Sequence, residues 1–436
     1  MLKIYTDLKD TRWLTYITEE FKRISSAKFS IQIDQIDEDE KHDPAIYYTS
    51  EPQHPNSLAN RSKKPHGDLT EISEGLFVYQ NTLAESEGFL VPYDIFYNAF
   101  LILSRLEEYQ YENEGNKINS YSSRHPRKDK KSFDYPLVNI YFQRLEEIIS
   151  NLFPELEFDQ EKNFRLDLSH DVDYVKKTIQ LLLKQTAFNA YNLLKSIASP
   201  KRFFSRLKST ITFPFTSYRY DCFDYWRGLE EGKGVRSVFY VYMNTGGKGP
   251  KTWLIDPSYR LKKNLSLQNK LAELEGAGFE IGLHGSLKSA VDRDKMREEK
   301  EELERILSHP VKRIRQHWLN FGELKTPYYH DGLFEIDSTL GWNDRMGFRS
   351  GCASKYRPWD HVNNKAFDYF VIPQVLMDSN IFDYSNVETA KDEAISMLKG
   401  LKKFKNVNAS ISWHYRTCSK DYKWHQVYEE ILDECL

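Results

Sequence analysis

The sequence contains little cysteine, and none of it has a metal-binding spacing. Its four cysteines, Cys222, Cys352, Cys418 and Cys435, are scattered and include no C-x-x-C pair. This excludes a zinc cluster built on cysteines and favours a protein of a reducing compartment.

Long apolar runs and a strong net charge are also absent. Nowhere do about 18 apolar residues follow one another, so no membrane-spanning helix is predicted. The formal net charge is only -3, which provides no overall field that would attract nucleic acid. The N-terminal residues have neither the apolar core nor the small-residue cleavage site of a signal peptide. We therefore expect a soluble, cytoplasmic protein with no nucleic-acid partner.

The length and the order of patterns predict two domains. A chain of 436 residues is too long for one ordinary core. Residues 1–160 mix short strand-like and helical patterns with polar loops, which favours a smaller α+β domain. Residues 161–436 alternate strand and helix signals, and this order predicts an α/β domain with a parallel sheet or barrel.

One segment has charge of a single sign. Between Tyr174 and Tyr220 there are nine Lys or Arg residues and no Asp or Glu. We interpret residues 174–220 as a basic helical insertion. It is either a solvated surface or a site of contact with an anionic surface, such as lipid headgroups of a membrane or an acidic glycan.

The first candidate site lies at the end of a predicted strand. The stretch "FRLDLSHDVDYVKK", residues 164–177, places Asp171 and Asp173 two residues apart. Side chains alternate along a strand, so these two carboxylates share one face and His170 points the other way. Two carboxylates on one face repel each other unless a cation lies between them or one stays protonated.

Other predicted strands also end in polar groups. His284 ends "FEIGLHGS", His414 ends "ISWHY", and Arg315 and His317 end "RIRQHW". Functional side chains gather at the carboxyl ends of strands in α/β folds. A divalent metal would relieve the carboxylate repulsion with His284 as a nitrogen ligand, and it would acidify a bound water. The second carboxylate could take the water's proton while His414 protonates the leaving group, so these groups indicate a metal-assisted hydrolase.

The motifs SHDVD, GLHGS, RQHW, GFRSG and SWHY, in this order, resemble the polysaccharide deacetylase superfamily (NodB homology, carbohydrate esterase family 4). The resemblance covers residues 161–436 and points to a divergent bacterial branch. The preceding part, with "PYDIFYNAFLILSRLEEYQYE", resembles an uncharacterised domain that often precedes this catalytic domain. The resemblance implies a distorted (β/α)7 barrel. It also implies a bound divalent metal, and zinc is the metal we expect. The implied reaction is removal of N- or O-linked acetyl groups from a cell-envelope glycan or a lipid-linked glycan precursor.

The same resemblance implies roles for individual residues. Asp171 falls at the position of the catalytic base and Asp173 at that of the metal-binding aspartate. His284 matches the first metal histidine, Arg315 the arginine that orients the base, and His414 the general acid of the last motif. The residues expected to contact substrate are Trp318, Asp337, Trp342, Arg349 and Trp413.

The sequence departs from the family at the second metal histidine, where it has Lys288. A protonated lysine cannot bind a divalent metal. The third protein ligand is then His317, or only water completes the site. Two other hypotheses follow. One is an inactive glycan-binding homologue in which the Lys288 ammonium occupies the place of the metal. The other is a nucleotide-sugar glycosyltransferase using the D-x-D motif, although no glycine-rich turn precedes that motif.

Overall fold

The chain divides into two compact units. The computed structural model describes residues 1–36, 44–62, 66–195, 204, 207, 210–216, 219–246, 249–382 and 386–436, so the predicted insertion at 174–220 lies partly outside the described residues. The predicted boundary between residues 1–160 and 161–436 stays a prediction. Unit 1 consists of Met1–Leu166, Phe321–Leu376 and Ser396–Ser410, and unit 2 consists of Asp167–Asn320, Met377–Ile395 and Ile411–Leu436.

Unit 1 begins with a small parallel sheet. Its four strands lie in the order β2-β1-β3-β4, and the neighbouring pairs are all parallel. The helices of this unit bury apolar residues in one large core with the sheet. The elements are β1 (Leu2–Thr6), α1 (Arg12–Ser25), β2 (Ile31–Gln35), β3 (Ala45–Thr49), β4 (Ser57–Ala59), α2 (Ile95–Leu103), α3 (Leu106–Asn113) and α4 (Leu137–Leu152).

The remaining parts of unit 1 are short. Two antiparallel strand pairs, β5 with β6 and β12 with β13, form separate two-stranded sheets. Several strands have only two residues, which is too short for any hydrophobic period to appear in the sequence. These elements are β5 (Leu69–Ser73), β6 (Leu76–Tyr79), α11 (Thr326–His330), β11 (Ile336–Asp337), β12 (Trp359–Asp360), β13 (Lys365–Ala366), β14 (Phe370–Val371) and β15 (Gln374–Met377).

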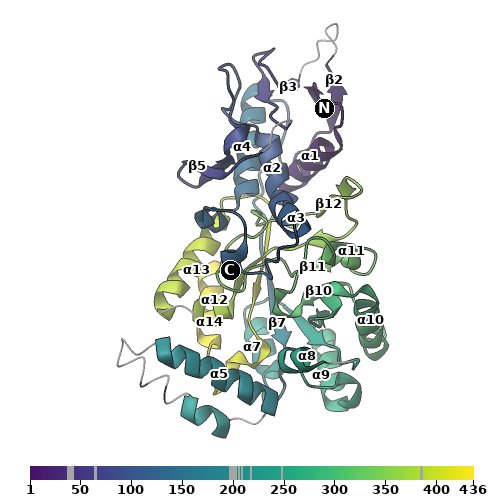
Figure 1. Ribbon diagram of the computed structural model, residues 1–436, viewed down its shortest axis with the longest axis vertical. Coiled ribbons are helices and arrows are strands. Elements are labelled where there is room, and N and C mark those ends of the chain that lie inside the picture. The colour runs from purple at the N-terminus through teal and green to yellow at the C-terminus, as the bar shows by residue number, and fades with distance from the viewer. Residues whose placement is uncertain are drawn as a thin grey trace. The chain divides into compact units, whose positions relative to one another are not determined.

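An eight-stranded sheet in the order β14-β11-β10-β9-β8-β7-β16-β15 confirms the predicted fold class, an α/β distorted barrel preceded by a smaller α+β part (Figure 1). Its strands β7 to β10 are parallel neighbours in chain order. The remaining helices and strands, which include the other strands of this sheet, are β7 (Phe164–Val172), α5 (Ile179–Lys195), α7 (Phe223–Gly232), β8 (Val238–Tyr242), α8 (Pro250–Ile255), α9 (Leu265–Gly276), β9 (Glu280–Gly285), α10 (Arg293–Leu307), β10 (Arg313–Gln316), α12 (Asp378–Phe382), α13 (Val387–Leu401), β16 (Val407–Ser412) and α14 (His425–Cys435).

Local sequence explains the elements around the candidate site. Strand β8, VFYVY, is buried at every position, as expected for a β-branched and aromatic strand covered on both faces. Helix α10 begins at Asp292, whose carboxylate accepts the amide of Lys295 at 3.1 Å and caps the helix. Among the described residues, no helix is both long and apolar enough to cross a membrane.

The register of the sheet aligns the predicted site residues. Tyr242 of β8 pairs with His284 of β9, and His284 pairs with Arg315 of β10, so these residues form one row across the sheet. Two glycines flank His284 because larger residues do not fit. A Cβ on Gly282 would lie 2.6 Å from the ring of Tyr240, and one on Gly285 would lie 2.3 Å from Gln316 Oε1. The motif GLHG therefore lets neighbouring side chains pack closely over β9.

A buried ion pair in unit 1 gives a test of its core. The guanidinium of Arg349 donates to both carboxylate oxygens of Glu108, at 3.0 and 2.7 Å, and neither side chain is more than 1% exposed. Replacing Arg349 by Met should lower the free energy of unfolding by about 3–5 kcal/mol, because Glu108 would be left as an unpaired buried charge. Urea denaturation measures this change.

The matched control is Arg297→Met, which breaks an exposed ion pair with Asp294 on helix α10. That change should cost less than about 1 kcal/mol. Equal effects of the two substitutions would contradict a structural role for the Arg349–Glu108 pair.

Candidate metal centre

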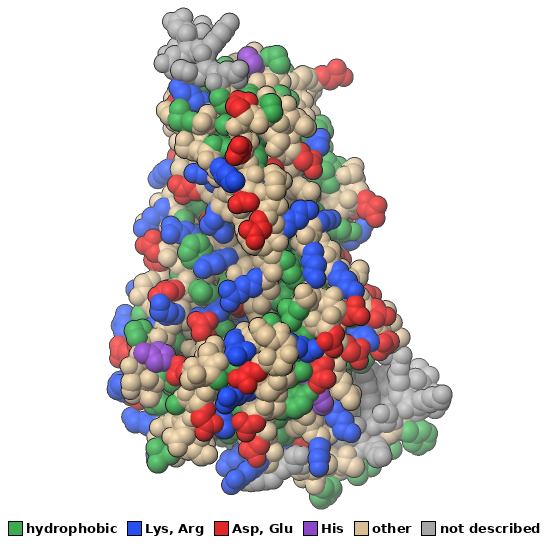
Figure 2. Space-filling view, turned by 180° about the vertical axis from the view of Figure 1, so that it is seen from behind, with side chains coloured by type: hydrophobic (Ala, Val, Ile, Leu, Met, Phe, Trp, Pro, Cys, Tyr) green, Lys and Arg blue, Asp and Glu red, His purple; other side chains and the backbone are tan. Residues whose placement is uncertain are grey.

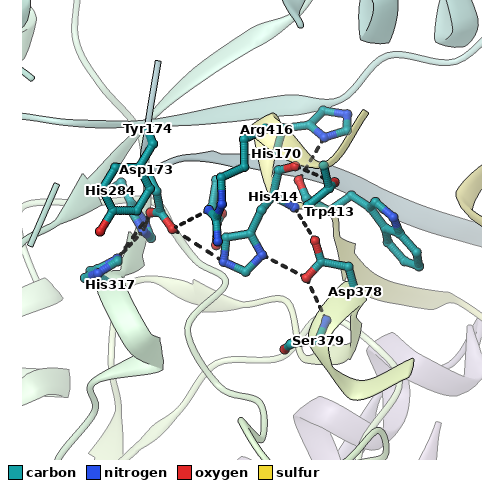
Figure 3. Close-up of polar contacts among 12 residues, drawn as sticks. His170, Asp173, Tyr174, His284, His317, Asp378, Ser379, Trp413, His414 and Arg416 are labelled. Atoms are coloured by element: carbon teal, nitrogen blue, oxygen red, sulfur yellow. Dashed lines mark hydrogen bonds and ion pairs between the residues drawn. The ribbon is translucent and has the colours of Figure 1, made fainter. Parts of the chain in front are cut away.

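Three buried side chains of unit 2 converge on one point (Figure 3). Asp173 directly follows β7, His284 lies in β9, and His317 directly follows β10. The Asp173 Oδ1 atom lies 3.2 Å from His284 Nε2 and 3.3 Å from His317 Nδ1. The two ring nitrogens are 3.0 Å apart. None of the three residues is more than 4% exposed.

The protons on both rings are fixed by backbone carbonyls on their far sides. His284 Nδ1 lies 3.0 Å from the carbonyl oxygen of Arg315, and His317 Nε2 lies 3.1 Å from that of Ile255. A carbonyl only accepts hydrogen bonds, so each of these nitrogens carries a hydrogen. In the neutral rings, the lone pairs of His284 Nε2 and His317 Nδ1 therefore face each other and the Asp173 carboxylate.

This arrangement fits a divalent cation. Two lone pairs and a carboxylate oxygen in close contact repel one another unless a positive charge lies among them. Asp173 Oδ1 is buried and accepts no well-oriented hydrogen bond, as expected for an atom aimed at a cation. Two imidazoles and one carboxylate, with their far nitrogens held by carbonyls, are a ligand set suited to zinc, and a centre with three protein ligands keeps a position for water or substrate.

The second oxygen of Asp173 is held by cationic groups. Its Oδ2 atom accepts a hydrogen bond from Arg416 Nη1 at 3.2 Å and lies 3.5 Å from His414 Nε2. These contacts fix the carboxylate so that only Oδ1 faces the two rings. Burial acts to raise the pKa of Asp173. Without a bound cation, protonation of the facing His317 and His284 rings outweighs burial and lowers that pKa well below the ordinary value.

Asp171 is kept ionised by an arginine. Arg315 Nη1 donates to Asp171 Oδ1 at 3.0 Å and to Ser169 Oγ at 2.7 Å, and its guanidinium lies over the ring of Tyr240. Burial acts to raise the pKa of Asp171, yet Arg315 and then His284 outweigh burial and lower that pKa. The structure thus contains a charged carboxylate two residues before the proposed metal ligand.

His414 is oriented by a different carboxylate. Its Nδ1 lies 2.8 Å from Asp378 Oδ1, and its backbone amide donates to Asp378 Oδ2 at 2.8 Å. Burial acts to lower the pKa of His414, but Asp378 outweighs burial and raises it. Nε2, the other ring nitrogen, faces the Asp173 side of the site, so His414 can present a proton there.

Aromatic and basic side chains border the centre. Lys184 Nζ of helix α5 donates to Tyr174 Oη at 3.2 Å and lies 5.4 Å from the centre of the Trp318 ring. Trp318 is 44% exposed, and its φ of 61° lies in the left-handed region that non-glycine residues rarely adopt. A strained, exposed tryptophan beside buried ligands is typical of a binding surface.

The structure brings together six of the residues singled out in the sequence. Asp173, His284 and His317 form the triad, His414 contacts Asp173, and Asp171 pairs with Arg315. Their catalytic and metal-binding roles stay predictions. His170 points away, as expected from strand alternation, and its ring nitrogens contact the Trp413 carbonyl and Glu230.

The predicted substrate residues other than Trp318 are buried among protein partners. Trp413 is fully buried in unit 2, with its indole N–H on the Trp424 carbonyl. The other three belong to unit 1. Asp337 pairs with His330 at 3.1 Å, Trp342 packs on Phe133, and Arg349 pairs with Glu108. All four residues therefore have structural partners within the protein, and we propose no role for these residues in catalysis.

Lys288 lies away from the triad. Its side chain is more than half exposed, and its ammonium pairs with Asp292 at 3.1 Å. The hypothesis that this ammonium takes the place of the metal is therefore wrong in this structure. His317 supplies the third protein side chain instead.

Three residues of the site were missed by the sequence interpretation. Asp378 directly follows strand β15, and the rule that selected the other strand-end residues could have found it. Arg416 lies two residues after His414, and Lys184 lies within the predicted basic insertion. No local pattern distinguishes these two long side chains from solvated ones.

One family model matches the first third of the chain. The family model described as "Family of unknown function (DUF7033)" matches residues 2–154. That match covers the part predicted as an N-terminal domain and assigns it no role. No curated protein matches this chain.

Several solved structures are similar over nearly two thirds of the chain. A putative polysaccharide deacetylase from Mycobacterium smegmatis is 15% identical with a TM-score of 0.38, over 64% of this chain and 86% of that chain. A CE4 family pseudoenzyme from Bacillus anthracis is 9% identical with a TM-score of 0.31, over 64% and 62%. A polysaccharide deacetylase from Bacillus cereus is 10% identical with a TM-score of 0.29, over 62% and 87%. At such low TM-scores, these similarities assign neither activity nor substrate to this chain.

The triad predicts metal binding that depends on His317. The purified protein should bind about one equivalent of a divalent ion, and His317→Ala should weaken binding at least about tenfold, because one of three ligands is lost. Elemental mass spectrometry after loading with zinc, cobalt or nickel measures the content.

His309→Ala is the matched control. His309 is an exposed histidine that pairs with Glu275, and its loss should leave the metal content unchanged. A full equivalent of metal in His317→Ala would show that His317 is not a ligand.

Proposed function

We propose that this protein is a metal-dependent hydrolase that removes N- or O-linked acetyl groups from a glycan, either a cell-envelope polysaccharide or its lipid-linked precursor. One observation carries the proposal. Three side chains that can bind a metal lie beside Asp171, whose pKa is lowered, and His414, whose pKa is raised. The order of the five sequence motifs supports the choice of acetylated glycans over other substrates.

The residues that would hold the metal are Asp173, His284 and His317. A divalent ion bound there would supply an acidified water and would polarise the acetyl carbonyl. Arg416 keeps Asp173 Oδ2 occupied, so Oδ1 remains the ligand atom. In the neutral rings, the carbonyls of Arg315 and Ile255 hold the hydrogen on the far nitrogen, which leaves the lone pair of the near nitrogen to bind the metal.

The two proton transfers fall to separate side chains. Asp171, which Arg315 keeps ionised, takes a proton from the attacking water while the oxygen of that water bonds to the acetyl carbon. The bond from that carbon to the sugar nitrogen or oxygen then breaks. His414, whose pKa is raised, gives its proton to the departing atom, and the products are acetate and the free amine or hydroxyl.

Loss of the base should stop turnover without loss of metal. Asp171→Asn should lower the rate of acetate release by about 10²–10⁴-fold, the usual contribution of a general base, with metal content unchanged. Enzymatic acetate detection on acetylated oligosaccharides measures turnover. Lys288→Ala serves as the control, since Lys288 lies away from the triad, and it should keep full activity. Unchanged turnover in Asp171→Asn would remove Asp171 from the mechanism.

The Asp378–His414 pair predicts a pH effect. A general acid must be protonated, so activity falls as the pH rises through the pKa of His414. Because Asp378 raises that pKa, Asp378→Asn should shift the alkaline limb of the pH–rate profile to lower pH by about one unit or more. Asp378→Glu retains the charge and should shift it less. An unmoved limb in Asp378→Asn would assign the proton donation to another group.

A further inference from the structure

Helix α5 exposes an uncharged stripe. Among the side chains of α5 that the structure describes, the exposed ones are Ile179, Leu183, Thr186, Ala187 and Ala190, which recur at the spacing of one helical face. Ile179 is 73% exposed and Leu183 is 55% exposed. Another side of the helix carries Gln180, which is buried, and Lys184, which contacts Tyr174.

This pattern is the reverse of that on helix α10. The exposed positions of α10 include Arg293, Asp294, Arg297 and Glu298, and all of these carry charge. A helix on the surface of a globular protein normally places charge outward and apolar residues inward. The outward stripe of α5 therefore needs an apolar partner.

Neighbouring segments extend the stripe into one surface. Pro214 and Thr216 line a groove together with Ile179, and Phe215 between them is 87% exposed. The Gln180 side chain donates to the Trp253 and Asp256 carbonyls, which ties helix α8 to α5. We call the set Ile179, Leu183 and Phe215, all exposed, the α5 surface.

The charge around the α5 surface is basic. Lys176 and Arg219 are exposed and pair with each other through a β-bridge. The chain has no Asp or Glu between Tyr174 and Tyr220. The nearby carboxylate of Asp421 is paired with Lys177 at 2.9 Å. In Figure 2, red and blue side chains are mixed over much of the visible face.

We propose that the α5 surface docks this protein on a membrane that contains anionic lipids. Exposed aliphatic and aromatic side chains with basic residues at their border are the features of a helix that lies in the bilayer interface. Anionic headgroups attract the Lys and Arg residues, and the apolar side chains enter the region below the headgroups. A purely apolar protein partner would leave the exposed Lys176 and Arg219 at this border unexplained.

Hydrogen bonds connect helix α5, which carries the docking surface, to the metal centre. The carbonyl of Ile255, the last residue of α8, lies 3.1 Å from His317 Nε2 and 3.4 Å from Lys184 Nζ. Leu183, which precedes Lys184, belongs to the α5 surface. Docking would therefore hold the triad near the membrane. The docking proposal does not depend on the proposed hydrolase activity, but together they point to a glycan anchored in lipid.

Vesicle sedimentation of the full chain tests the proposal. We expect binding to phosphatidylcholine vesicles that contain phosphatidylglycerol, weaker binding to phosphatidylcholine alone, and loss of binding at high salt. The double variant Leu183→Ser/Phe215→Ser should bind at least about tenfold more weakly, because two large apolar side chains no longer enter the bilayer. Lys176→Glu/Arg219→Glu should weaken binding to anionic vesicles by at least about tenfold.

The matched control is Leu265→Ser/Val362→Ser. These two residues are 72% and 64% exposed and lie outside the α5 surface, so binding should be unchanged. Circular dichroism confirms that each variant is folded. Absence of binding to both vesicle types would overturn the proposal, and so would equal binding by all variants. Self-association of the protein that is lost in Leu183→Ser/Phe215→Ser, without vesicle binding, would show that a second copy covers this surface.

Discussion

The candidate site depends on two backbone carbonyls that decide where the histidine protons lie. Because the Arg315 and Ile255 carbonyls each require a donor, His284 and His317 must turn their lone pairs toward Asp173 Oδ1. The resulting cluster has no internal hydrogen-bond donor while both rings are neutral. Such a site is organised for a cation before one arrives, and its ligands need little rearrangement to bind one. The peptide backbone therefore does as much as the side chains to define this centre.

The sheet supplies the other half of that organisation. Pairing between β9 and β10 places His284 level with Arg315. The Arg315 guanidinium reaches Asp171 although two strands, β8 and β9, separate β10 from β7. Arg315 stabilises the charge of Asp171, whereas Arg416 and His414 contact the second oxygen of Asp173. Each carboxylate thus has its own cationic partner, so two buried acids close in sequence can both stay ionised.

The sequence predicts the parts of this site that follow a local rule. Strand alternation and strand ends select the aspartates of β7 and the histidines of β9, β10 and β16, and the alternation of strands and helices predicts the α/β class. Partners that meet only through the fold are not predictable in this way. Glu108 and Arg349 are 241 residues apart, and nothing near either residue reveals the other. The two-residue strands are equally hidden, because they are shorter than one period of the pattern. The local sequence also does not reveal the partners of Lys184, Asp337, Trp342, Arg349 and Arg416.

Helix α5 explains why the basic insertion could be interpreted in two ways. Composition alone records its charge of one sign but not which face carries it. In the structure, the inward face carries Gln180 and Lys184, which bind the carbonyls of α8 beside the metal centre. Those contacts place the polar residues of the helix inside, and this leaves Ile179 and Leu183 outside. The exposed stripe is therefore linked physically to the buried site. The side of α5 that carries Gln180 and Lys184 makes the contacts beside the metal centre, and Ile179 and Leu183 are left in water, which solvates apolar side chains poorly.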